Sequence, residues 1–221
     1  MIGAGRFVVV AVALVAVALV AAGGCAVDDR DIKARPEPIL IATFEDGTLQ
    51  PNDARFNRWA STIYNTENGD RVYRVTSPGR DSGFALELTW DVTDTPNGVM
   101  EYPGALIRTQ ALGSIDLTRY TTFSFSFHVV QGPYVPVESI QVSIGCDELR
   151  TAVILAQPVG SEWQSVDLPL QAFVEPVWSL TGVDLEDCLS RADQFGFGTT
   201  YNLHDGERAA ATLLLDDILF R

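Results

Sequence analysis

Hydrophobic residues recur at every second position over long stretches of this chain. Phenylalanines stand at positions 123, 125 and 127, with Ser126 and His128 at the alternate positions. The same period of two runs through residues 140–146. A period of two is typical of β-strands with one buried face. Further short apolar runs, bounded by Gly, Pro, Asn or Asp, occur at residues 39–44, 71–76, 84–89, 152–156, 164–168, 194–200 and 212–220.

Many short strands with little helical periodicity predict an all-β fold, a two-sheet antiparallel β-sandwich. Only residues 185–192 have a pattern that suits one or two helical turns. Neither an internal repeat nor a domain boundary is found after Pro38, so residues 39–221 are predicted to form one domain.

The start of the chain has the pattern of an export signal. Arg6 precedes an apolar run over residues 7–22, and Gly23 and Gly24 lead into Cys25. Small residues ending in a cysteine resemble the lipobox of bacterial lipoproteins, which implies cleavage of residues 1–24 and lipidation of Cys25. A retained membrane-spanning anchor and ordinary signal cleavage remain open alternatives.

Lipidation would place the protein in the bacterial cell envelope, held at the membrane through its lipid and facing the periplasm or the cell exterior. Residues 25–38, which are rich in Asp and contain Pro36 and Pro38, are predicted to be a tether. The 221 residues have a net charge of −14 and one lysine, Lys33. This charge balance excludes a protein that neutralises a nucleic-acid backbone, so we expect no nucleic-acid partner.

The predicted export determines which oxidation state we expect for the cysteines. Cys146 and Cys188 form an even pair once Cys25 is lipidated, and an oxidising compartment favours a disulfide between them. The alternative is two buried free thiols.

Five segments, in order, resemble the galactose-binding-like jelly roll of carbohydrate-binding modules, and the pattern is near that of family 11. The complex I intermediate-associated proteins share this architecture. The resemblance extends over residues 39–221. Its segments are IATFEDG at 41–47, SGFALEL at 82–88, IDLTRYTTFSF at 115–125, EWQSVDLPLQAF at 162–173 and LDDI at 215–218.

Modules of this kind often hold a structural Ca²⁺ between a glutamate of the first strand and an aspartate of the last. The resemblance therefore implies a calcium site at Glu45 and Asp216, with Asp217 as the alternate ligand. Carboxylate oxygens are the ligands that Ca²⁺ prefers. The alternative interpretation is that both aspartates only close the strand through backbone hydrogen bonds.

Two sets of residues are candidates for binding a sugar, because sugars are held by flat rings and by polar side chains. We expect Trp163 in the core, and aromatic residues in loops at a rim. Alternation is expected to place four polar residues on one side of adjacent strands, as a concave face, although any solvated sheet face has this pattern. The ring candidates are Trp90, Tyr102, Tyr134 and Trp178, and the polar candidates are Ser126, His128, Gln141 and Ser143.

Motifs of nucleophilic, zinc-dependent or phosphate-binding enzymes are absent. The sequence therefore favours a non-catalytic glycan-binding lipoprotein of the cell envelope. The alternative is an envelope lipoprotein that binds another protein through the same jelly roll, and a glycan-active enzyme is the less favoured third hypothesis.

Overall fold

The computed structural model describes residues 36–64, 68–93, 104–137, 139–146, 149–155, 162–176, 182–200, 203 and 206–221. Its contacts divide the chain into two units, Met1–Ala34 and Arg35–Arg221. The predicted signal peptide and Cys25 lie outside the described residues. No helix in the described ranges is long and apolar enough to cross a membrane.

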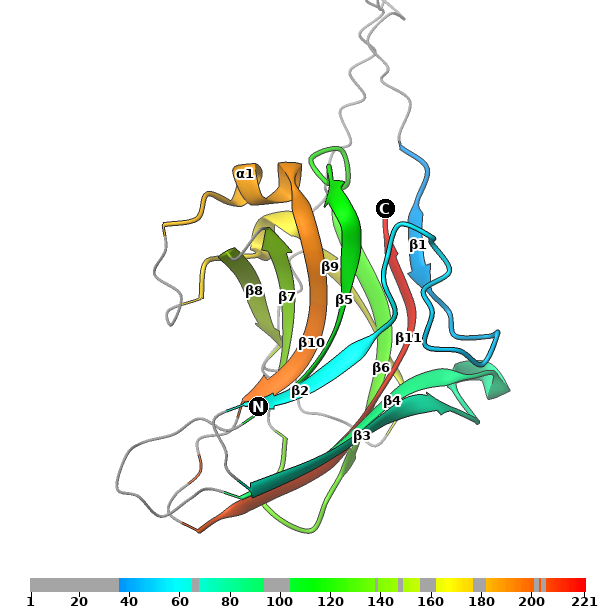
Figure 1. Cartoon of the computed structure of the whole chain (residues 1–221), viewed down its shortest axis with the longest axis vertical. Coiled ribbons are helices and arrows are strands. Elements are labelled where there is room, and N and C mark those ends of the chain that lie inside the picture. Colours follow the sequence, from blue (N-terminus) through cyan, green and yellow to red (C-terminus); the bar gives the residue numbers. More distant parts are fainter. Residues whose placement is uncertain are drawn as a thin grey trace, which may run out of the picture. The chain divides into compact units, whose positions relative to one another are not determined.

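The first sheet has six antiparallel strands in which β11 is central (Figure 1). The order is β3–β4–β11–β6–β9, and β1 pairs with the end of β11 beyond the reach of β4. The strands are β1 (Ile39–Ala42), β3 (Asn68–Thr76), β4 (Ala85–Thr93), β6 (Thr122–Gln131), β9 (Gln164–Pro169) and β11 (Arg208–Phe220).

The second sheet has five antiparallel strands in the order β2–β5–β10–β7–β8. The strands are β2 (Ala60–Tyr64), β5 (Gly104–Ile115), β7 (Ile140–Cys146), β8 (Leu149–Leu155) and β10 (Ala192–Thr200). The described residues also include three short helical segments: η2 (Arg80–Ser82), η3 (Leu170–Ala172) and α1 (Leu185–Ser190). The predicted two-sheet antiparallel sandwich is confirmed.

Aromatic side chains from both sheets meet between them. Phe123 and Phe125 of β6 point inward, and their rings lie 5.9 and 4.9 Å from that of Phe197 in β10. Phe220 of β11 stacks on Phe123 with centroids 4.5 Å apart. All four side chains are buried, and burial of one such ring stabilises the fold by about 2–3 kcal/mol. The hydrophobic residues at alternate positions in the sequence therefore form the inward face of each sheet.

Helix α1 is attached to the second sheet by a covalent bond. Asp184 caps its first turn by accepting a hydrogen bond from the Asp187 backbone N–H (3.0 Å). Cys188 in the helix is bonded to Cys146 at the end of β7, with their Cα atoms 5.2 Å apart. Both the predicted disulfide and the predicted short helix are present.

Candidate functional site

The four polar candidates do not share one face. Ser126 and His128 lie on β6 in the first sheet, whereas Gln141 and Ser143 lie on β7 in the second. The expectation of a single polar face is wrong because the segment between the two strands crosses from one sheet to the other. Alternation predicted which side chains avoid the core, but consecutive strands need not be neighbours in a sheet.

The outward face of the second sheet brings together polar side chains around a glycine-lined centre. Gln141 is paired across the sheet with Gly198, and Ser143 with Gly196. On the other side of β10, Gly196 is paired with Arg108 of β5. We call this surface the second-sheet face. Its polar members are Thr62, Arg108, Gln110, Gln141, Ser143 and Gln194.

The two glycines of β10 are required by close packing. A Cβ on Gly198 would lie 2.7 Å from the carbonyl oxygen of Ala105 and 3.2 Å from Leu106 Cδ1. A Cβ on Gly196 would lie 3.0 Å from Ser143 Oγ. The centre of the second-sheet face therefore has no side chain from β10. Arg108 Nη1 donates to Gln194 Oε1 (3.3 Å), which orients both side chains on this surface.

The outward face of the first sheet carries an unexpected aromatic pair. The ring of Trp163, which precedes β9, lies 6.0 Å from the imidazole of His128. Trp163 is partly exposed here, so its assignment to the core is wrong. It lies beside β6 on the outward face, because the register Phe127↔Gln164 brings the next position, Trp163, alongside His128. The sequence itself indicated this position, because Trp163 lies two and four residues before Ser165 and Asp167, and residues at these spacings share one face of a strand.

Trp90 is not a surface ring. It is 1% exposed and points into the core from the middle of β4. The sequence-based boundary placed the strand end at Thr89, but β4 continues to Thr93. Trp90 has the parity of Leu86 and Leu88, so the longer strand turns it inward.

Of the remaining ring candidates, Tyr134 is on the surface. It is 42% exposed, and the guanidinium carbon of Arg208 lies 4.4 Å from its ring centroid. Arg208 also pairs with Asp91, which fixes the guanidinium over the ring. Tyr134 is thus a surface ring with one side occupied by a cation. Tyr102 and Trp178 lie outside the described residues.

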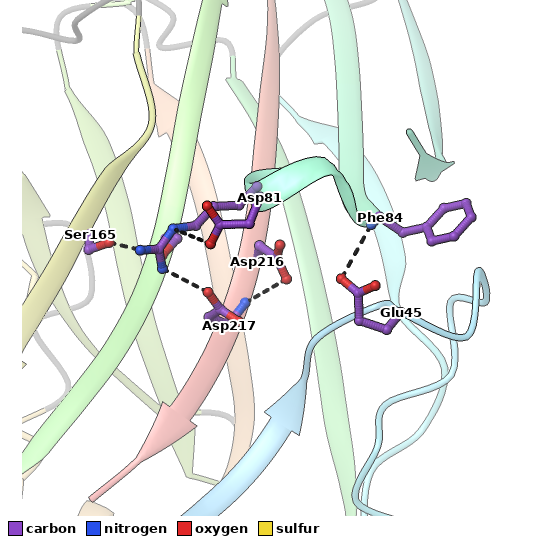
Figure 2. A network of polar contacts seen from close by, with 8 residues as sticks. Glu45, Asp81, Phe84, Ser165, Asp216 and Asp217 are labelled. Carbon is purple, nitrogen blue, oxygen red and sulfur yellow. Dashed lines mark hydrogen bonds and ion pairs between the residues drawn. The ribbon is translucent and has the colours of Figure 1, made fainter. Parts of the chain in front are cut away.

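Figure 2 shows the predicted metal ligands: Glu45 lies in the segment that follows β1, and Asp216 and Asp217 lie on β11. Asp216 Oδ1 accepts a hydrogen bond from the Asp217 backbone N–H (2.8 Å), and Glu45 Oε1 accepts one from the Phe84 N–H (3.3 Å). Asp217 Oδ2 accepts from Arg80 Nη1 at 2.8 Å. The charge of Asp217 is therefore already paired with that of Arg80, and the metal hypothesis rests on Glu45 and Asp216.

Asp216 is buried, with 3% of its surface exposed, and its charge is poorly compensated. Burial is the main cause that raises the pKa of its carboxyl to about 6. The nearby charges of Asp217 and Glu45 raise this pKa further, while backbone N–H groups lower it. A divalent cation would remove this cost, so the pair suits a hard metal ion. Among the described residues, no group of three or more His, Cys, Asp or Glu side chains is arranged for metal binding, so further ligands would have to be carbonyl oxygens or water.

Backbone geometry around the two carboxylates is unusual. Phe44, Asp81 and Asp217 all have left-handed backbone angles, with φ of 58°, 52° and 51°. Such angles are uncommon for residues other than glycine and are costly for Phe. Gly83 permits the close approach of Glu45, because a Cβ there would lie 2.1 Å from Glu45 Oε1.

Comparison with solved structures identifies proteins of the same fold. The structure is similar to the family 11 carbohydrate-binding module of the cellulosomal cellulase Lic26A-Cel5E of Clostridium thermocellum, with a TM-score of 0.52 and 14% identity. A second structure of a family 11 module from Clostridium thermocellum, in complex with a β-1,3-1,4-mixed-linked tetrasaccharide, has a TM-score of 0.52 and 16% identity. Each match covers 83% of this chain and 94% of the other.

Sequence comparison adds no relative: no protein-family model matches the chain, and no curated protein matches it significantly. The structural likeness confirms that this chain has the β-sandwich jelly roll of carbohydrate-binding modules.

Proposed function

We propose that this chain is a non-catalytic glycan-binding protein of the bacterial cell envelope, anchored through lipid on Cys25. The observation that carries the proposal is its sandwich, which is similar to that of a module in complex with a β-1,3-1,4-mixed-linked tetrasaccharide. The export pattern that ends at Cys25 supports the location.

The second-sheet face is the surface best suited to a sugar chain. Gln141 and Gln194 each offer a donor and an acceptor, and Arg108 adds further donors, which together match the hydroxyl groups of a glycan. These side chains stand on a sheet rather than on loops, so little conformational entropy is lost on binding. Gly196 and Gly198 contribute no side chains to the centre of the face, where Leu106 of β5 packs beside both glycines.

We also propose that Glu45 and Asp216 hold a structural Ca²⁺. The buried, poorly compensated carboxylate of Asp216 beside Glu45 supports this, as does the oxygen-only donor set. The ion would link the segment after β1 to β11. It would stabilise the fold and take no part in sugar recognition.

Calorimetric titration with the β-1,3-1,4-mixed-linked tetrasaccharide, supported by a glycan array, tests the glycan proposal. Gln141→Ala should weaken binding about three- to tenfold, the usual effect of losing one neutral hydrogen bond. His128→Ala, on the opposite face, is the matched control and should leave the affinity unchanged.

The outcomes separate the possibilities. If His128→Ala weakens binding and Gln141→Ala does not, the second-sheet face is the wrong surface. If no glycan binds, the glycan proposal fails, and the envelope protein-interaction hypothesis takes its place.

A further inference from the structure

A pocket of about 660 Å³ opens at one side of the sandwich. It is bounded by the loop that follows β1 and by β3, the edge strand of the first sheet. Its volume is within the range of about 300–1,000 Å³ found for small-molecule sites. The lining residues are Gly47, Thr48, Leu49, Gln50, Arg58, Tyr73, Arg74 and Val75.

The charge of this pocket is opposite to that of the protein. Its lining contains two arginines, Arg58 and Arg74, and no acidic residue, although the chain has a net charge of −14. Within the described part of the chain, Arg58 makes no side-chain hydrogen bond or ion pair. Arg74 Nη2 is 3.1 Å from Glu87 Oε1, yet 63% of its side chain is exposed. A guanidinium has five N–H donors, so Arg58 has donors to offer an anion, whereas Arg74 is paired with Glu87 on the face of β3 opposite to Tyr73.

The walls also carry aromatic surface. Tyr73 lines the pocket and is 36% exposed. Phe84, which is 38% exposed, lies beside it, with one ring carbon 4.0 Å from the position of a Cβ on Gly47. Flat rings beside guanidinium groups suit a ligand that has both an apolar ring face and an anionic group.

Backbone hydrogen bonds hold the pocket in shape. Trp59 N–H donates to the Leu49 carbonyl (3.0 Å), and Asn57 N–H donates to the Gln110 carbonyl of β5 (2.7 Å). These bonds flank Arg58 on both sides, and Trp59 itself is buried. The guanidinium is therefore presented from a backbone that is already ordered before any ligand binds.

We infer that this pocket is a second sugar subsite, selective for a carboxylated sugar such as a uronate. The inference rests on the proposed glycan-binding function. The carboxylate of the sugar would accept hydrogen bonds from Arg58, while its ring lies against Tyr73. Since the interaction is between charges at a surface, binding should weaken as salt increases.

Titration of the purified protein with trigalacturonate, in 50 mM and 300 mM NaCl, tests the inference. Arg58→Gln should weaken binding about tenfold or more, because a hydrogen bond to a charged group is lost. Arg58→Lys should retain part of the affinity. Arg191→Gln, which removes the same charge from the end of α1, should have no effect. The mixed-linked tetrasaccharide should bind Arg58→Gln and wild type equally.

Two results would overturn the inference while leaving the glycan proposal intact. They are binding of the neutral tetrasaccharide without binding of trigalacturonate, and equal affinity of wild type and Arg58→Gln for trigalacturonate. Poly-L-glutamate provides the test of ligand class. If it binds as tightly as trigalacturonate, and through Arg58, the pocket recognises acidic polypeptides and the sugar assignment is wrong. Failure of the glycan proposal itself would appear as binding of neither sugar.

Discussion

Asp216 is a buried carboxylate and one of the two proposed calcium ligands. Its pKa is raised from 3.8 to about 6 in the folded protein. Between these two pH values the folded state binds more protons than the unfolded state, so the free energy of unfolding falls as pH rises from about 4 to 6. At neutral pH the ionised Asp216 therefore destabilises the metal-free protein, by an amount on the order of 3 kcal/mol.

Asp216→Asn should remove this cost, since the amide keeps an oxygen for the Asp217 N–H. In chelator at pH 7 the variant should melt at or above the wild-type temperature. Calcium should raise the wild-type Tm by about 5–10 °C when the free ion is 100-fold above its Kd, and should not affect the variant. Thermal denaturation with Ca²⁺ and with EDTA measures both effects.

Asp167→Asn is the matched control, because this aspartate of β9 is exposed and is paired with Arg221. It should retain the full response to calcium. A wild-type Tm that is the same in calcium and in chelator would show that calcium does not stabilise the fold.

Two tryptophans show what residue-level reasoning can predict. For Trp90 the parity was readable in the sequence, but the error lay in the strand boundary, which pattern alone places poorly. For Trp163 the motif suggested a core ring although its alternation with Ser165 and Asp167 indicated the outward face, and only the register of β9 against β6 shows that its neighbour is His128. Parity follows from local sequence, whereas register depends on distant strands.

At the scale of elements, the bond between Cys146 and Cys188 joins α1 to β7 across 42 residues of sequence. Closing a loop of this length stabilises a fold by about 4 kcal/mol in the chain-entropy model. Cys188→Ala should therefore lower the Tm by about 8–16 °C at this domain size. Thermal denaturation of oxidised wild type, of the variant and of reduced wild type measures the effect. Equal midpoints for oxidised and reduced protein would contradict it.

The elements themselves were largely predictable. The alternating runs at residues 123–130 and 140–146 are indeed strands, and the turn or two of helix expected at 185–192 is α1. The assignment of strands to sheets was not predictable, because it depends on loops that cross the sandwich. This is why β6 and β7, adjacent in sequence, direct Ser126 and Gln141 to the outward faces of different sheets. The pocket that contains Arg58 could not be predicted from the sequence, because its lining residues come from separated segments.

For the whole molecule, the acidic domain and its proposed lipid anchor predict a protein that stays at the membrane surface. Intact-mass analysis of the membrane fraction should find a mature chain that begins at lipidated Cys25. Cys25→Ser should shift the protein out of this fraction or leave it unprocessed. A mature protein that begins at Met1, or an unmodified Cys25, would contradict the anchor.

The position of β11 has a consequence for how the protein is made. It is the last strand along the chain, yet it lies in the centre of the first sheet, in contact with β1, β4 and β6 (Figure 1). The first sheet therefore cannot assemble until the ribosome has synthesised residues 208–220. Until then, β4 and β6 lack the partner that lies between them, and their edges are open to chaperones or to aggregation. A domain that cannot complete its first sheet until its last strand is made is well suited to export before it folds.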